Sequence, residues 1–347
     1  MNHRFLRPGV AAAMGAALLF GAGTPLAKLL LAGISPWLLA GLLYLGSGIG
    51  LTVYRVITRA PSVRLNRGEA PWLIGAILSG GVVGPVLLMV GLTSMPASGA
   101  SLLLNAEGVF TSLLAWFAFK ENFDRRILLG MTAIVAGMII LSWPGDAQFS
   151  GLLPAAAILG ACFAWGIDNN LTRKVSLNDA TWIASVKGLA SGSTNLVLAF
   201  ALGAAVPALP GAIAAMLVGL FAYGVSLALF VVALRHLGTA RTGAYFSIAP
   251  FFGAVLALLM GEPLTLSLLS AGGLMAFGVW LHLTEQHAHE HTHEVMEHEH
   301  EHTHDAHHQH DHAFPVSPGT RHTHRHRHDA LTHSHAHFPD AHHRHPH

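Results

Sequence analysis

The sequence has few charged residues and almost no cysteine. Only 11% of its 347 residues are charged, whereas 52% are apolar, and a typical soluble domain has about twice that charged share. Its single cysteine, Cys162, lies inside an apolar run. A disulfide framework and a thiolate metal cluster within one chain are therefore excluded. A soluble protein of this length could not keep so much apolar surface from water, so we expect a lipid bilayer to surround most of the chain.

Net charge is also nearly absent, at +1. Nucleic-acid-binding proteins usually carry an excess of positive charge, so no nucleic-acid partner is expected. The sequence contains no recognisable pairing of a nucleophile with a base and no cofactor-binding motif. We therefore expect no enzymatic activity and no required cofactor.

Long apolar runs are what the sequence does have. A membrane-spanning helix needs roughly 20 mostly apolar residues, and ten segments meet this requirement. The predicted spans are residues 9–31, 36–57, 71–92, 97–119, 127–143, 151–171, 180–202, 211–234, 242–260 and 264–283. The first has arginines before it, as a signal peptide would, but it is too long and lacks a clear cleavage site. We predict an all-α integral membrane protein of ten helices.

The basic residues predict the orientation of these helices. Thirteen lysines and arginines fall in the N-terminal segment and in every second loop, and none falls in the five opposite loops. Lysine and arginine mark the cytoplasmic side of a membrane. We therefore expect a multi-pass protein of the bacterial-type inner membrane, with both termini in the cytoplasm.

The chain also reads as two copies of a five-helix unit, residues 1–143 and 144–284. Phe20-Gly21 in the first predicted helix corresponds to Trp165-Gly166 in the sixth, and a basic residue follows each pair seven residues later. Because five is odd, the second copy would cross the membrane in the opposite sense. Inverted repeats of this kind are common in secondary transporters, with the substrate site between the halves.

Several stretches resemble a known family. They are residues 19–28 (LFGAGTPLAK), 34–36 (ISP), 96–121 and 261–265 (GEPLT). In these residues the chain resembles the drug/metabolite transporter superfamily, in its ten-helix EamA branch. The resemblance covers residues 9–284. It implies two inverted repeats, a central cavity that opens alternately to each side, and export of small molecules driven by a proton gradient.

Two positions depart from the family pattern. Glu107 is followed by Gly108, where the family often has proline, and residues 42–44 read Leu-Leu-Tyr where it often has an arginine. Coupling or recognition that depends on those positions is not implied for this chain.

Glu107 is the most notable charge inside a predicted span. A charged side chain at the centre of a membrane helix costs about 2.5–3.5 kcal/mol on insertion scales, so each one is a functional candidate. Burial favours the neutral, protonated carboxyl, and a carboxyl that loads and releases protons suits a proton-coupled exporter. On an ideal helix Ser98, Ser101, Asn105, Gly108 and Ser112 form a small-residue stripe opposite Glu107. We expect that stripe to pack and Glu107 to face the cavity; the alternatives are that Asn105 faces substrate, or that Glu107 is a hydrogen-bonded structural carboxyl.

A second candidate lies near the predicted cytoplasmic ends of helices 6 and 7. Asp168 and Lys187 can pair there, with Asn169 beside them. The pair would line the mouth of the transport path or would only fasten two helices together. Lys28, near the other membrane face, would snorkel to the lipid headgroups or take part in a gate.

The composition changes abruptly at residue 285. Histidine supplies 23 of the last 61 residues, and few residues there could build a core, so a disordered cytoplasmic tail over 285–347 is expected. Neutral imidazole binds Ni²⁺, Cu²⁺, Zn²⁺ and Co²⁺, and histidine tracts are a compositional metal-binding signal. The candidate ligands are His287, His289, His291, His293, His298, His300, His302, His304, His322, His324, His326 and His328.

Three functions fit these observations. The first is a secondary active exporter of metabolites or drugs whose tail binds transition-metal ions. The alternative is an efflux protein for nickel, cobalt or zinc, which the tail favours because it would raise the local ion concentration at the mouth. The third is a membrane-anchored metal buffer without transport. The expected partners are the lipid bilayer, a small-molecule substrate and metal ions, and the chain would be a monomer or a homodimer.

Overall fold

A computed structural model of the chain describes residues 8–63, 65–119, 125–142, 152–175, 178–237, 245–283, 288–293, 296–302, 322–328 and 331–336. The chain divides into two units, Met1–Glu285 and Gln286–His347. The described part of the first unit is helical, and that of the second unit consists of strands.

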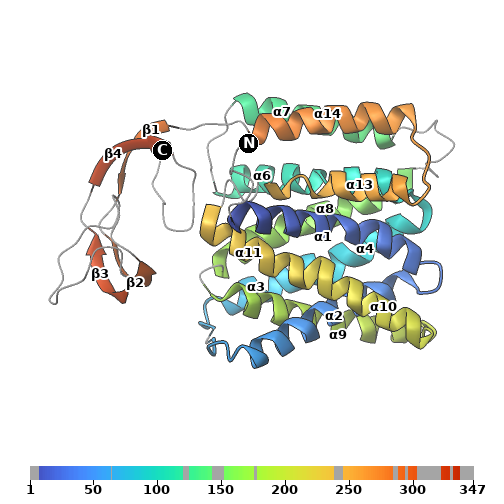
Figure 1. Cartoon of the computed structure of the whole chain (residues 1–347), viewed down its shortest axis with the longest axis horizontal. Helices are drawn as coiled ribbons and strands as arrows, with labels where there is room; N and C mark the ends of the chain where they lie inside the picture. The colour runs from blue at the N-terminus through green and yellow to red at the C-terminus, as the bar shows by residue number, and fades with distance from the viewer. Residues whose placement is uncertain are drawn as a thin grey trace. The chain divides into compact units, whose positions relative to one another are not determined.

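The helices of the first unit follow one another closely along the chain. They are α1 (Pro8–Leu30), α2 (Pro36–Ile57), α3 (Ala70–Ala76), η2 (Ile77–Val83), α4 (Gly84–Ser94), α5 (Ala97–Leu103), α6 (Ala106–Phe119), α7 (Arg125–Ser142), α8 (Leu152–Thr172), η3 (Arg173–Val175), α9 (Ala180–Ala201), α10 (Leu209–Gly219), η4 (Leu220–Val225), α11 (Ser226–Leu237), α13 (Ala249–Leu259) and α14 (Leu266–Leu283). They lie side by side in a bundle, with α7 against α14 along one edge and α2 against α9 near the opposite edge (Figure 1).

Five helical stretches of the described chain are long and apolar enough to cross a membrane. They are Gly9–Leu30, Pro36–Ile57, Ala70–Ser94, Leu152–Thr172 and Leu209–Phe230, and three shorter apolar helices accompany them. These helices are compatible with a membrane protein. The count of ten spans and the inverted repeat stay predictions.

Small residues lie between the helices and large apolar residues lie on the outside of the bundle, as a lipid environment requires. Small side chains such as Ala13, Ala16 and Ala17 are fully buried between helices, whereas Leu153 and Leu266 are 84% and 82% exposed. In a bilayer, lipid tails cover large apolar side chains, while small residues let the helix backbones approach one another. The large apolar outer surface is therefore the surface expected to contact lipid.

The prediction of one continuous helix over residues 97–119 is wrong. The chain forms α5 and then α6, with a turn at Leu104 and Asn105 between them. Asn105 Nδ2 donates to the carbonyl of Leu102 at 2.9 Å, and such side-chain bonds to nearby backbone compete with the helical ladder. A similar turn at Ser247 and Ile248 precedes α13.

Two helical stretches contain π-helical segments. The segment η2 interrupts the run from α3 to α4, and η4 interrupts the run from α10 to α11. A π-helical turn leaves the regular hydrogen-bond ladder and is often found at functional sites. The sequence analysis did not predict these segments.

Glycines bring α2 and α9 into close backbone contact. A methyl group on Gly188 would lie 2.6 Å from the backbone nitrogen of Gly48, and one on Gly192 would lie 2.6 Å from that of Leu45. No side chain fits in that space. These small-residue positions thus serve packing within the bundle.

The second unit contains four strands in two antiparallel pairs. The strands β1 (Ala288–His293) and β4 (Leu331–Ala336) form one pair, and β2 (Met296–His302) and β3 (His322–His328) form the other. The disorder expected for the tail as a whole stays a prediction. The alternating sequence has the period of a strand, and the register sets Glu297 opposite Arg327 and Glu299 opposite Arg325, where opposite charges favour pairing.

Candidate functional site

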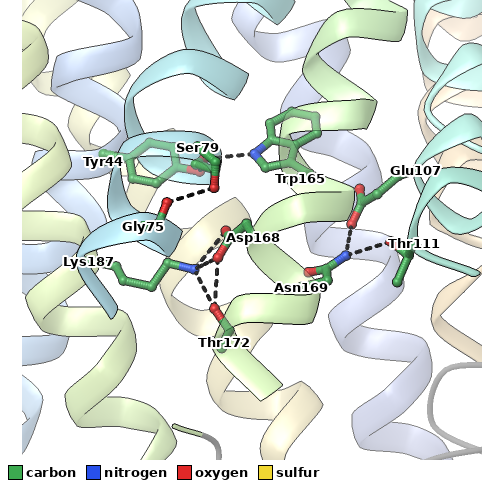
Figure 2. A network of polar contacts seen from close by, with 11 residues as sticks. Tyr44, Gly75, Ser79, Glu107, Thr111, Trp165, Asp168, Asn169, Thr172 and Lys187 are labelled. Atoms are coloured by element: carbon green, nitrogen blue, oxygen red, sulfur yellow. Dashed lines mark hydrogen bonds and ion pairs between the residues drawn. The ribbon is translucent and has the colours of Figure 1, made fainter. Parts of the chain in front are cut away.

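Polar side chains from three helices meet inside the bundle (Figure 2). Glu107 lies in the first turn of α6, and Thr111 follows one turn later on the same helix. Asn169 of α8 reaches both, because its Nδ2 donates to Glu107 Oε1 at 2.8 Å and to Thr111 Oγ1 at 3.2 Å. Glu107 is half-buried and Asn169 is exposed.

The predicted pair of Asp168 and Lys187 forms next to this group. Lys187 Nζ of α9 lies 2.5 Å and 2.7 Å from the two carboxylate oxygens of Asp168 on α8, and 3.2 Å from Thr172 Oγ1. Asp168 is only 7% exposed. Each charge therefore neutralises the other in a site with little water. Substituting one partner of a buried ion pair strongly destabilises a protein, because the other charge stays buried without compensation.

The π-helical segment η2 packs directly against Asp168. The carbonyl of Gly80 accepts from Tyr44 OH at 2.9 Å and from Trp165 Nε1 at 2.8 Å, and the carbonyl of Gly81 accepts from Asn195 Nδ2 at 3.0 Å. A methyl group on Gly80 would overlap the Asp168 carboxylate. Three side-chain donors from α2, α8 and α9 thus hold the irregular segment in place.

Within the part of the chain that the structure describes, Glu107 forms no ion pair. Lys187, the basic side chain nearest to it in this network, is bound to Asp168. When Glu107 is ionised, the three groups together carry one negative charge. The site can therefore accept one positive charge, as a proton or as a cation.

Asn105 and Lys28 lie away from this network. Asn105 is buried at the turn before α6, where its Nδ2 also approaches Met275 Sδ at 3.9 Å. Lys28 Nζ donates to the carbonyls of Leu92 and Thr93, the latter at 3.3 Å. Neither contacts Glu107 in the bonds described.

The predicted small-residue stripe does not hold along its length. Ser98 and Ser101 are buried, whereas Gly108 is exposed, and no atom lies within 4 Å of a methyl group placed on it. The turn at Leu104 and Asn105 changes the direction in which the following residues point. The stripe and Glu107 therefore do not lie on opposite sides of a single helix.

Several polar partners were missed from the sequence. Thr111 and Thr172 are each four residues after an acidic residue, a spacing that places two side chains on one helix face, so this signal was available. Tyr44 and Trp165 act through contacts between distant segments, and no local pattern marks them.

Another missed residue, Glu262, connects the two predicted repeats. Its Oε1 accepts from the backbone N–H of Ala97 at 2.6 Å and its Oε2 from that of Ser98 at 2.8 Å. A carboxylate at the N-terminus of a helix satisfies free N–H groups and complements the helix dipole. Lys28 holds the carbonyls at the end of α4, so the turn between α4 and α5 is fixed from both sides.

The structure gives no metal geometry for the histidines. Among the residues searched, which are those the structure describes, no group of three or more histidine, cysteine or acidic residues is arranged to hold a metal ion. His287 and His304 lie outside the described residues, and the other ten predicted ligands lie in the strands β1, β2 and β3.

Known proteins resemble both the sequence and the fold. Residues 7–143 match the model of the EamA-like transporter family. An uncharacterized transporter of Methanothermobacter thermautotrophicus is 29% identical over 290 residues, which cover 77% of this chain and 83% of that protein. A solved crystal structure with 16% identity has a TM-score of 0.61 and covers 78% of this chain and 95% of its own. That likeness concerns the fold alone.

Two shorter matches have more specific names. A probable amino-acid metabolite efflux pump of Salmonella typhimurium is 32% identical over 82 residues, 23% of this chain and 27% of the pump. A probable 4-amino-4-deoxy-L-arabinose-phosphoundecaprenol flippase subunit of Pseudomonas fluorescens is 33% identical over 82 residues, 24% of this chain and 71% of the subunit.

Proposed function

Because this chain belongs to the EamA-like transporter family and is a multi-pass membrane transporter of small molecules, we propose that it exports metabolites or drugs across the inner membrane in exchange for protons. The observation that carries the proposal is the half-buried Glu107 carboxylate, which forms no ion pair with any residue that the structure describes. The efflux pump similar to one part of the chain supports the same direction of transport.

Glu107 has partners suited to both of its protonation states. The Asn169 amide donates to the ionised carboxylate in the observed arrangement. A carboxamide also has an oxygen that accepts, so rotation of this group would serve the protonated form, and the hydroxyl of Thr111 can donate or accept. Each state would then keep a hydrogen bond, and the carboxyl could exchange its proton without an unsatisfied polar group.

The neighbouring ion pair has a positioning role in this proposal. Asp168 and Lys187 join α8 to α9 and neutralise each other. Asn169 follows Asp168 on the same helix, so the pair also fixes the backbone that presents the amide to Glu107. The charge that changes during transport would be that of Glu107 alone.

The distribution of lysines and arginines among the loops supports a cytoplasmic location for both termini. In that orientation, a proton gradient directed inward would drive export. Alternating access would then expose Glu107 first to one side and then to the other, as is typical of transporters built from discontinuous helices.

Transport assays with inverted membrane vesicles test the proposal. Labelled amino acids, amines and a fluorescent dye are offered with and without an imposed proton gradient. We expect gradient-dependent accumulation of at least one class, and its loss in Glu107→Gln. The matched control is Glu69→Gln, which changes a carboxylate near Asn66 in the loop before α3. Accumulation that is equally gradient-dependent in Glu107→Gln would refute the coupling role.

The tail supports a second proposal, that it binds Ni²⁺, Zn²⁺, Co²⁺ or Cu²⁺ in the cytoplasm, and with it the alternative that such an ion is the cargo. Uptake of ⁶³Ni²⁺ and ⁶⁵Zn²⁺ into the same vesicles separates the two. Gradient-dependent uptake that requires Glu107 would make the protein a metal exporter. Tail-dependent adsorption without a gradient effect would leave metal as a bound ion and an organic compound as the cargo.

A further inference from the structure

Three of the candidate membrane spans have an end at one basic surface of the helical bundle. The spans Pro36–Ile57 and Leu152–Thr172 finish there, and Ala70–Ser94 begins there. The segments next to these ends, residues 55–69 and 173–179, contain six basic residues and two acidic ones. Groups just outside the ends of membrane helices lie at the level of the lipid headgroups. We call the described residues of these two segments, together with the first turns of α3, the basic surface.

The connection between α2 and α3 is folded onto the helix ends. Leu65 packs against a buried cluster that includes Leu73 of α3 and Val175 of η3. Arg55 Nη2 donates to the carbonyl of Pro61 at 2.7 Å, which holds the first part of the connection against the end of α2. The basic surface is therefore organised before any ligand arrives, and ordering it costs little free energy on binding.

Trp72 and Lys174 form the centre of the basic surface. Trp72 lies in the first turn of α3 and is 42% exposed. Lys174 Nζ of η3 lies 6.0 Å from the centroid of the Trp72 ring, an arrangement in which the ring face attracts the ammonium group. Exposed tryptophan is typical of the headgroup level of a membrane. The contact holds a positive charge at that level.

Arg67 lies in a tight turn directly before α3. The backbone N–H of Glu69 donates to the carbonyl of Asn66 at 2.9 Å, and that of Asn66 donates to Glu69 Oε2 at 3.1 Å. Arg67 is exposed within this turn, five residues before Trp72. Over the ranges that the structure describes, Arg67 takes part in no ion pair. Its guanidinium group can therefore bind an anion next to the Trp72 ring.

Both acidic residues of these segments already have polar partners. Glu69 Oε2 accepts from Asn66 and, at 3.4 Å, from Asn178 Nδ2. Asp179 Oδ1 lies 2.7 Å from Arg55 Nη1. The positive charge that remains is carried by the other basic residues of the surface.

We propose that the basic surface binds the headgroup of an anionic phospholipid from the surrounding bilayer. Arg67 and Lys174 would bind the phosphate, because guanidinium and ammonium groups form strong charge-assisted hydrogen bonds with phosphate oxygens. The Trp72 ring would lie beside the headgroup. Ile57 at the end of α2 and Ile74 in α3 are 73% and 56% exposed, and the acyl chains would cover them.

A bilayer lipid explains more of this surface than a soluble anion does. A soluble phosphate would contact the basic groups alone. Exposed apolar side chains next to basic ones match a molecule that has an anionic head and apolar chains. The inference depends neither on the cargo nor on the coupling role of Glu107, since it concerns the ends of the spans and not the network inside the bundle.

Two lipids with the same acyl chains test the inference. Dioleoyl phosphatidylglycerol, which is anionic, and dioleoyl phosphatidylcholine, which is zwitterionic, are titrated into the full chain in non-ionic detergent. Native mass spectrometry gives the dissociation constant of each bound lipid. We expect the first phosphatidylglycerol to bind roughly tenfold or more tightly than phosphatidylcholine, because basic residues near a membrane surface favour anionic lipid.

Variants locate the lipid. Arg67→Gln and Lys174→Gln should each weaken phosphatidylglycerol binding about fivefold, as the loss of one surface cation predicts, and Trp72→Ala about twofold to fivefold. Phosphatidylcholine binding should stay unchanged in the two glutamine variants, which excludes a folding defect as the cause. The matched control is Arg126→Gln, because Arg126 is exposed at the start of α7, at the other edge of the bundle from α2 (Figure 1).

Three results would overturn the inference. Equal affinity for the two lipids would show that the headgroup charge is not recognised. An equal loss in Arg126→Gln and Arg67→Gln would show that the whole surface attracts anionic lipid without a defined site. Displacement of phosphatidylglycerol by an equal concentration of glycerol 3-phosphate would show that the surface takes a soluble anion. Each result is obtained without a transport assay, so it leaves the proposed export function untouched.

Discussion

Asp179 illustrates how single residues fix the ends of these helices. It caps the N-terminus of α9, where its Oδ1 accepts from the backbone N–H of Trp182 at 3.0 Å and from Thr181 Oγ1 at 2.6 Å, and Arg55 Nη1 of α2 lies 2.7 Å from the same oxygen. Burial by itself would raise the pKa of this carboxyl, but the hydrogen bonds and the Arg55 charge outweigh it and lower the pKa below its usual value.

The lowered pKa predicts how stability depends on pH. The contribution of Asp179 is fully present above its unfolded pKa of about 3.9 and is lost as the pH falls through the lower folded pKa. We expect Asp179→Ala to lower the free energy of unfolding by about 1 kcal/mol at neutral pH, as loss of a helix cap does. Thermal unfolding in detergent between neutral and strongly acidic pH measures this.

Asp179→Asn is the informative companion variant. Asparagine keeps the capping oxygen but carries no charge, so the loss at neutral pH should be smaller and the acid-dependent change should shrink. If Asp179→Asn unfolds with the same acid dependence as the unaltered protein, another group is responsible.

At this scale the sequence predicted charge pairing better than neutral contacts. Asp168 and Lys187 were expected to pair because both lie near the same end of neighbouring spans, and buried opposite charges have few other solutions. Tyr44 and Trp165 could not be assigned, because their partner is a backbone carbonyl in the π-helical segment η2. A backbone carbonyl inside a helix can accept such extra hydrogen bonds where the helix is locally irregular. Hydrophobic periodicity in the sequence does not reveal where such an irregularity occurs.

Among the elements, the crossing of α2 and α9 depends on Gly188. A methyl group there would lie 2.6 Å from the nitrogen and 2.7 Å from the Cα of Gly48, so the backbones would have to separate. We expect Gly188→Ala to destabilise the protein by about 1–3 kcal/mol, as overpacking does. Midpoints of thermal unfolding in detergent report the change.

Gly108→Ala provides the matched control. It makes the same chemical change in a helix, but no atom lies within 4 Å of the added methyl group. Stability should be unchanged or raised by up to about 1 kcal/mol, because alanine favours helix more than glycine does. Equal effects of the two substitutions would contradict the close-packing account.

The contact between Glu262 and α5 can be tested by hydrogen exchange. Glu262→Ala removes both acceptors from the amides of Ala97 and Ser98. Exchange at these amides should then accelerate by about tenfold or more, since an N–H group at a helix start has no acceptor within the helix. Mass spectrometry of the peptide over residues 93–99 detects it. Glu69→Gln should leave this peptide unchanged, and unaltered exchange in Glu262→Ala would dismiss the cap.

Element positions were largely predictable, and their interruptions were not. Helices such as α2 and α9 follow the predicted spans within a few residues, because a bilayer requires long apolar runs. At the break between α5 and α6, the Asn105 side chain donates to the backbone carbonyl of Leu102. A single bond of this kind is only slightly favoured over a continued helix. Asn105 was read instead as part of a helical stripe. The preference of a single side chain is too small to signal a break in advance.

For the whole molecule, the division into two units predicts separable behaviour. Deleting residues 286–347 removes the second unit and leaves Met1–Glu285 intact. We expect the shortened protein to fold and to keep its export of an organic compound, while binding of Ni²⁺ in calorimetric titrations falls sharply. In the full chain that binding should weaken below about pH 6.5, where imidazole becomes protonated and cannot bind metal.

A result that contradicts this view is equally clear. If the shortened protein retains full Ni²⁺ binding, the helical unit contains the metal site. If it loses export of the organic compound as well, the second unit takes part in transport, and the two units are not functionally separate.

The Glu262 carboxylate also has a consequence for the order of biosynthesis. It follows Ala97 by 165 residues, so the start of α5 leaves the ribosome well before its acceptor exists. At synthesis rates of 5–20 residues per second, the interval is roughly 10–30 s. During that time the amides of Ala97 and Ser98 must find temporary acceptors, such as water or lipid headgroups. The first half of the nascent chain therefore waits in the membrane with an incomplete helix start, and arrival of the last loop completes it.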